Sequence, residues 1–182
     1  MKITKEFEGL NRIENGDYVY EGDLISDGDI EIELDDRLIV KGKIEAKNAI
    51  TAKVSIHAGC SISAGCSISA GCSISAGCSI SAGGSISAGD GISAGGSISA
   101  GWGISAGDGI SAGDGISAGD GISAGGSISA GEFIDCGKRI FAGTSVYWDS
   151  DDCDKSIKCK ELLRGDIAYG DLIEEARNET QT

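Results

Sequence analysis

The sequence predicts an all-β protein, a quadrilateral β-solenoid in which the chain winds into stacked, four-sided coils. Three observations predict it. Branched aliphatic residues recur every six positions from Ile32 to Val146, and a fixed short period indicates a solenoid. Residues 59–131 are nearly identical copies of the unit Ser-Ile-Ser-Ala-Gly-x. The 182 residues include 30 Gly, no Pro and only 5% aromatic residues, so Ile and Ala must fill the interior.

Each six-residue unit predicts one side of a coil. Within Ser61–Ala64, Ile and Ala alternate with Ser, and this period of two is typical of a short strand with one buried face. Gly65 then provides a permissive backbone for a corner. Because six is an even number, the inward pair keeps its parity from unit to unit. The pattern predicts twenty sides in register, from the pair Ile32/Leu34 to the pair Val146/Trp148.

The residue that follows each glycine suggests how many sides make one coil. Six-residue sides close either as three sides, as in the hexapeptide acyltransferases, or as four sides, similar to pentapeptide-repeat proteins. In the acyltransferase pattern this corner position is small, because it sits at a tight turn. Here it holds Cys66, Asp90, Trp102 and Lys138. We therefore favour four sides, about 24 residues per coil, about five coils, a right-handed winding and a rod of about 24 Å.

The ends of the chain depart from the period and predict two caps. Residues 1–31 mix aromatic and charged side chains, and we interpret them as an N-terminal cap. The β-solenoid is expected to span residues 32–148. Residues 149–182 are interpreted as a polar loop, a C-terminal cap and a frayed tail. Such caps would cover the unpaired strand edges that otherwise template aggregation.

Four of the seven cysteines occupy the corner position at six-residue intervals: Cys60, Cys66, Cys72 and Cys78. In a four-sided coil they would be the four corners of a single coil. Adjacent corners would then lie on the order of 13–18 Å apart, too far for the ~2.3 Å bonds of a zinc site or for a disulfide. We interpret the four as candidate thiol attachment points or as neutral substitutes for the glycines of other repeats, and we expect no metal.

The three other cysteines have different surroundings. Cys136 occupies the alanine position of a repeat, and Cys159 follows Ile157 as Ala64 follows Ile62. Both are expected to be small buried apolar residues. Cys153 lies in the polar loop and is expected to be exposed.

A four-sided coil would stack the acidic corner residues in columns: Asp90 on Asp114, Asp108 on Glu132 and Asp120 on Thr144. We interpret them as solubilising charges, and a divalent cation that bridges a column is the alternative. His57 occupies an outward position without an evident catalytic partner. Trp102 would stand above Gly126, as a variant or a spectroscopic reporter.

The near-identity of the repeats, such as Ile104-Ser-Ala-Gly-Asp-Gly, resembles a consensus-engineered four-sided β-solenoid. The irregular ends are similar to uncharacterised bacterial proteins with six-residue Gly-Ile-x-Ala-Gly-x repeats. This resemblance implies a designed structural scaffold without catalytic activity or cofactor. The alternatives are a binding module, either an acidic mimic of DNA or an ice-binding solenoid, and a metal-binding variant.

The net charge of −14 disfavours nucleic acid as a direct ligand. The sequence has no apolar stretch of about 18 residues and no evident leader, so we expect a cytoplasmic protein that does not bind membranes. No partner is required by the pattern. A monomer or a weak dimer formed through strand edges is expected.

Overall fold

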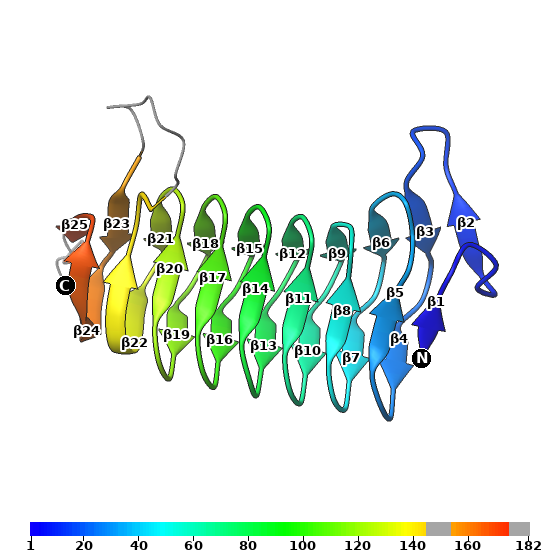
Figure 1. The fold of residues 1–182 in the computed structure, drawn as a ribbon, viewed down its shortest axis with the longest axis horizontal. Coiled ribbons are helices and arrows are strands. Elements are labelled where there is room, and N and C mark those ends of the chain that lie inside the picture. The colour runs from blue at the N-terminus through cyan, green and yellow to red at the C-terminus, as the bar shows by residue number, and fades with distance from the viewer. Residues whose placement is uncertain (145–153, 175–182) are drawn as a thin grey trace, which may run out of the picture.

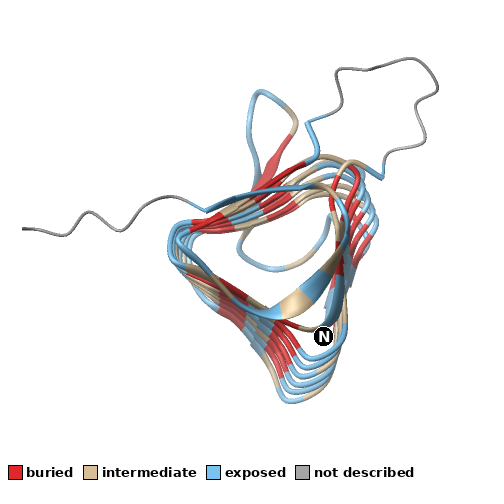
Figure 2. Ribbon diagram, turned by 90° about the vertical axis from the view of Figure 1, so that its left-hand side faces the viewer, coloured by how far each residue is buried: buried red, intermediate tan, exposed pale blue. Residues whose placement is uncertain are grey.

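The computed structural model describes residues 1–144 and 154–174, and these residues form strands but no helix. Short strands stack in layers along a rod, with the N-terminus and the C-terminal strands at opposite ends (Figure 1). Seen along the rod, the coils are triangular, with buried residues along the three faces and exposed residues at the corners (Figure 2). The predicted all-β solenoid is therefore confirmed.

Each coil contributes one strand to each of three faces. Face 1 contains β1 (Lys2–Ile3), β5 (Ile30–Ile32), β8 (Ile50–Ala52), β11 (Ile68–Ala70), β14 (Ile86–Ala88), β17 (Ile104–Ala106) and β20 (Ile122–Ala124). Face 2 contains β2 (Leu10–Arg12), β3 (Tyr18–Tyr20), β6 (Leu38–Val40), β9 (Ile56–Ala58), β12 (Ile74–Ala76), β15 (Ile92–Ala94), β18 (Ile110–Ala112), β21 (Ile128–Ala130), β23 (Ser156–Cys159) and β25 (Asp171–Glu174). Face 3 contains β4 (Leu24–Ser26), β7 (Ile44–Ala46), β10 (Ile62–Ala64), β13 (Ile80–Ala82), β16 (Ile98–Ala100) and β19 (Ile116–Ala118).

Two longer strands pass round the corner between face 3 and face 1. The first half of β22 (Phe133–Phe141) pairs with β19 on face 3, and its second half pairs with β20 on face 1. Strand β24 (Glu161–Tyr169) lies parallel to β22 and follows the same path, with irregularities in the register.

The pairing register shows that one coil consists of three six-residue units. Ile62 pairs with Ile80, the equivalent residue three units later, and neighbouring strands on the other faces have the same offset. Three sides therefore close one coil, and the predicted four-sided, square coil is wrong. Face 2 has nine parallel layers from β3 to β25, which corresponds to eight turns rather than five. At about 4.8 Å per turn, the rod is about 38 Å long.

The tight position of each corner is the glycine, and the residue after it is not crowded. A Cβ on Gly65 would lie 2.0 Å from the carbonyl oxygen of Lys47 in the coil below, and a Cβ on Gly83 would lie 2.2 Å from that of Gly65. The next residue projects outward, as Trp102 shows with an exposed fraction of 65%. Large residues after the glycine are therefore compatible with a three-sided coil and do not indicate four sides.

The core consists of the inward aliphatic and alanine columns. From Leu38 to Ile140, the aliphatic residue that begins each side is 0–1% exposed, and the alanine columns beside these residues are also buried. Complete burial of one such side chain contributes about 1.5–3 kcal/mol. Because each coil gains this burial only against its neighbours, the stability of the rod is a property of the stack.

The first coil begins earlier than the six-residue period indicates. Strands β3, β4 and β5 pair in parallel with β6, β7 and β8, so the stack extends back to Tyr18. Their offset along the chain is two residues longer than that of the central coils. The side predicted as Ile32/Leu34 is instead Ile30/Ile32, and the two additional residues lie in the corner before Leu38. Strand β2 pairs antiparallel with β3 at this end.

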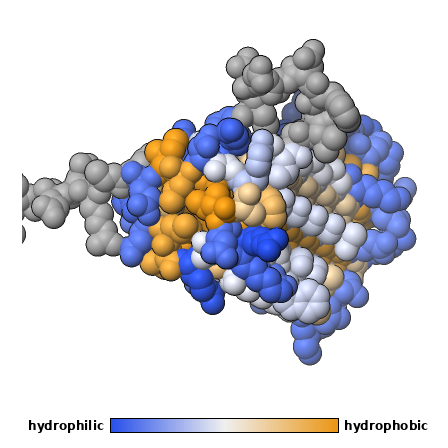
Figure 3. All heavy atoms as spheres, turned by 60° about the vertical axis from the view of Figure 1, so that its left-hand side comes forward, coloured by the Kyte–Doolittle hydropathy of each residue, from blue (hydrophilic) through white to orange (hydrophobic). Residues whose placement is uncertain are grey.

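The opposite end presents apolar side chains to solvent. Strands β24 and β25 form the last layer, and 39–53% of each of Leu163, Tyr169, Leu172 and Ile173 is exposed. Figure 3 shows apolar surface gathered at this end of the rod. The predicted side Val146/Trp148 lies outside the described residues.

Candidate corner thiols and a groove between glycine columns

The four corner cysteines point outward but do not belong to one coil. Cys60, Cys66 and Cys78 are exposed, and Cys72 is partly exposed. Since a coil has three corners, Cys60, Cys66 and Cys72 occupy the corners of one coil. Cys78 lies directly above Cys60, and its backbone N–H donates a 3.0 Å hydrogen bond to the Cys60 carbonyl oxygen. The predicted ring of four corners is therefore wrong, whereas the outward orientation is confirmed.

Cys136 and Cys159 are buried, as their positions in the repeat predict. Their exposed fractions are 0% and 1%. The Cys136 thiol lies 3.1 Å from the carbonyl oxygen of Asp120. Burial raises the pKa of both the Cys136 and the Cys159 thiol. Both cysteines are thus poor nucleophiles in the folded chain, and Cys153 lies outside the described residues.

The acidic corner residues stack on residues three units away, so the columns predicted for a four-sided coil are wrong. Asp108 stacks on Asp90, and Glu132 stacks on Asp114, as the backbone hydrogen bonds between these residues show. Asp120 instead faces Lys138, whose Nζ lies 2.8 Å from its carboxylate. Among the described residues, no group of three or more His, Cys, Asp or Glu side chains is arranged to hold a metal ion.

The two single residues singled out in the sequence also have new neighbours. His57 lies on face 2 between Ile39 and Ser75, and it is partly exposed. Trp102 is in the corner column of Gly84 and Asp120, not in the column of Gly126. Neither side chain forms a hydrogen bond or ion pair with another residue that the structure describes.

A groove on face 1 is a feature that the sequence reasoning missed. Its volume is ≈ 970 Å³. It arises because the column before the buried isoleucines changes from Ser85 to Gly103 and Gly121 and then to Arg139. The two glycines have no side chain to fill the surface, so the face is hollow between Ser85 and Arg139. The signal was present in the sequence as the change from Ser-Ile to Gly-Ile units.

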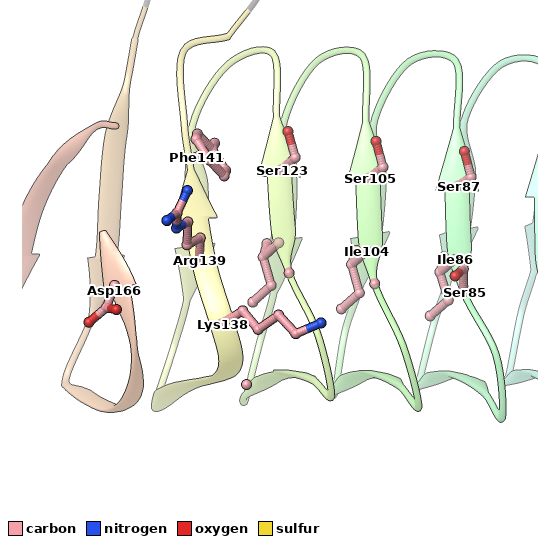
Figure 4. Close-up of a pocket in the computed structure, with 14 residues that line it drawn as sticks. Ser85, Ile86, Ser87, Ile104, Ser105, Ser123, Lys138, Arg139, Phe141 and Asp166 are labelled. Atoms are coloured by element: carbon pink, nitrogen blue, oxygen red, sulfur yellow. The ribbon is translucent and has the colours of Figure 1, made fainter. Parts of the chain in front are cut away.

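The groove has a polar side and a mixed end (Figure 4). Ser87, Ser105 and Ser123 form an in-register row along one side. The C-terminal end of the groove is formed by four side chains of different chemistry: Lys138, Arg139, Phe141 and Asp166. A smaller groove of ≈ 340 Å³ lies on face 2, where Gly91 and Gly109 follow one another in the corresponding column between Ser73 and Ser127.

An ion-pair cluster joins the antiparallel pair β2 and β3 and the residues before it to the corner before Leu38, which contains the two additional residues. The Tyr18 hydroxyl donates a 2.8 Å hydrogen bond to Asp35, and Lys5 Nζ lies 2.7 Å from the same carboxylate. These two hydrogen bonds lower the pKa of Asp35 to about 2. Arg12 forms a 2.8 Å ion pair with Asp36 beside it. These contacts connect the first corner to the N-terminal residues, and we interpret the cluster as structural.

No known protein family, curated protein or solved structure matches this chain. The part of the chain that the structure describes includes no helix that could cross a membrane.

Proposed function

We propose that the chain is a structural scaffold without catalytic activity or cofactor, which presents surface groups at regular positions along a rod. The observation that supports this role is the tolerance of the corner position. It accepts Cys60, Gly84, Asp90 and Trp102, while the strand after each of them keeps its inward Ile and Ala buried. A surface group can therefore be exchanged without a change in the core.

The near-identity of residues 59–131 supports an engineered, consensus-derived origin of the central coils. In such a rod Cys60, Cys66, Cys72 and Cys78 serve as attachment points, because exposed thiols combine access with selective reactivity. We further propose that the chain needs no partner, binds neither nucleic acid nor membranes, and acts as a monomer or weak dimer in the cytoplasm.

Conjugation of the corner thiols tests this proposal. In a Cys153→Ser background, reduced with dithiothreitol and freed of the reductant before labelling, we expect four thiols to react rapidly with a maleimide, while Cys136 and Cys159 react only after unfolding. The folded conjugate should keep its free energy of unfolding within about 0.5 kcal/mol, since surface changes rarely cost more. Calorimetry of the conjugate and the unmodified protein measures this difference.

Two matched cysteine variants serve as controls for the conjugation. Asp114→Cys adds a thiol at a further corner and should increase the rapid count by one. Ala106→Cys places a thiol at a buried position, 6% exposed, and should add no rapidly reacting group. Two or fewer rapidly reacting thiols, or a conjugate that melts like an unfolded chain, would overturn the outward assignment and with it the scaffold role.

The regular hydroxyl rows favour one alternative, a binding module of the ice-binding class. Ser63, Ser81 and Ser99 lie in register on face 3, and similar rows occupy the other faces. Layers of parallel strands recur every ~4.8 Å, which gives each row a constant spacing. Serine lacks the methyl group of threonine, and for a scaffold we expect no thermal hysteresis. A measurable freezing-point gap that disappears in Ser81→Lys/Ser99→Lys would instead establish binding to ice.

A further inference from the structure

The three-sided coil makes two of the corner thiols neighbours. Cys78 stacks on Cys60, with a 3.0 Å hydrogen bond between their backbones. The strands that follow them, β13 and β10, are in register from Ile80 and Ile62 onward. Layers of parallel strands lie about 4.8 Å apart, and disulfides join residues whose Cα atoms are about 4.4–6.8 Å apart. The Cys60 and Cys78 backbones therefore have a separation that a disulfide can span.

The other two corner thiols have no such neighbour in their columns. Cys66 lies between Asn48 and Gly84, as the backbone hydrogen bonds of its corner show. Cys72 lies below Asp90, whose N–H donates to its carbonyl oxygen. Different corners of one coil are separated by a whole side of the triangle. Cys66 and Cys72 are consequently internal controls for any reaction that needs two adjacent thiols.

We propose that Cys60 and Cys78 form a dithiol site, which small disulfides such as oxidised glutathione convert into a disulfide between adjacent coils. Both thiols are exposed, so the reagent can reach either one. The inference rests on the corner exposure used for the proposed scaffold role. The four corner cysteines then comprise one reactive pair, Cys60 and Cys78, and two independent attachment points, Cys66 and Cys72.

The reaction proceeds by two thiol–disulfide exchanges. The thiolate of one cysteine attacks a sulfur of glutathione disulfide, forms a mixed disulfide and releases one glutathione thiolate. The second cysteine thiolate then attacks the protein sulfur of the mixed disulfide and releases the second glutathione. Cys60 and Cys78 together lose two protons and two electrons, and one glutathione disulfide is reduced to two glutathione molecules.

The test counts free thiols by intact mass in the full chain with Cys66→Ser, Cys72→Ser and Cys153→Ser, so that Cys60 and Cys78 are the corner thiols that remain. The folded protein is incubated with glutathione disulfide at mildly alkaline pH, quenched with acid, unfolded and alkylated with a maleimide. We expect the loss of two alkylated thiols without retained glutathione at Cys60 and Cys78, in a monomer, and full recovery after reduction with dithiothreitol. The Cys153→Ser protein that keeps Cys66 and Cys72 should lose the same pair and should in addition retain one glutathione on each of Cys66 and Cys72, where no neighbouring thiol can displace it.

Single variants of the pair determine whether adjacency is the cause. In the background without Cys66, Cys72 and Cys153, Cys60→Ser and Cys78→Ser should each stop at a glutathione adduct on the remaining corner cysteine, since no second thiol can displace it. Loss of two thiols in either single variant, a disulfide-linked dimer, or stable adducts on both cysteines of the pair would overturn the proposal. Rapid maleimide labelling of Cys66 and Cys72 reports on the corner exposure separately, so a failed pair is distinguishable from a failed scaffold role.

Discussion

Replacement of Ile104 by Lys is expected to abolish cooperative folding of the central coils at pH 7. Ile104 is 1% exposed and lies between the isoleucines of β14 and β20. Full burial lowers the pKa of a lysine to about 5–7, so a neutral lysine at pH 7 costs about 4–5 kcal/mol relative to the charged lysine of the unfolded chain. This penalty approaches the whole stability of an ordinary domain, which is about 5–15 kcal/mol.

The pH dependence identifies the cause of this loss. A lysine whose pKa is lowered in the folded state binds fewer protons there than in the unfolded chain, so the stability of Ile104→Lys should rise with pH. Its deficit relative to the wild type should therefore be smaller at pH 10 than at pH 7. Ser105→Lys, on the exposed side of the same strand, should melt like the wild type at both values. Circular dichroism monitors the melting of both variants. Equal melting temperatures of Ile104→Lys and Ser105→Lys would contradict the assignment of Ile104 to the buried face.

Gly89→Ala should destabilise the stacked coils, whereas Gly91→Ala, two residues later, should not. The Cβ of an alanine at position 89 would lie 1.9 Å from the carbonyl oxygen of Gly71, so one coil must move away from the other. Overpacking of this kind costs about 1–3 kcal/mol. In chemical denaturation, the free energy of unfolding of Gly89→Ala should be lower by this amount, while its dependence on denaturant concentration should not change.

Gly91→Ala is the matched control for this contact. Its Cβ would lie 3.4 Å from the nearest atom, the Gly109 carbonyl oxygen, and its backbone is not in the left-handed region. We expect this variant to be as stable as the wild type or to gain about 0.4–1 kcal/mol, because alanine restricts the unfolded chain. If Gly89→Ala and Gly91→Ala had the same stability, close contact between coils could not be the reason for the glycine column.

The strand pattern could be predicted from the sequence because it depends on local chemistry. Alternation of Ile62, Ser63 and Ala64 assigns the buried face without knowledge of the closure, and the burial of Cys136 follows from the same parity. The number of sides could not be predicted in the same way. It depends on contacts between residues three units apart, and the decisive crowding is at Gly65, not at the varied residue after it.

The errors at the corner thiols followed from this error in the closure, whereas two further errors had other causes. The outward orientation of Cys60 needed only the repeat position, whereas its neighbour Cys78 could be identified only with the correct coil length. The two additional residues before Leu38 displaced the first predicted side, because a period that is counted backward from the ideal repeats passes over an insertion. The groove near Arg139 required the three-dimensional stacking of columns that are distant in the sequence.

Because the three sides of a central coil have equal length, the rod can be extended by a fraction of a turn, in steps of one six-residue unit. One additional six-residue unit would rotate everything beyond it by about a third of a turn and advance it by about 1.6 Å, a third of the ~4.8 Å layer spacing. Three units would restore the original azimuth and lengthen the rod by one full layer. The angle between groups at the two ends and the distance between them can thus be set in discrete steps, by the number of units alone.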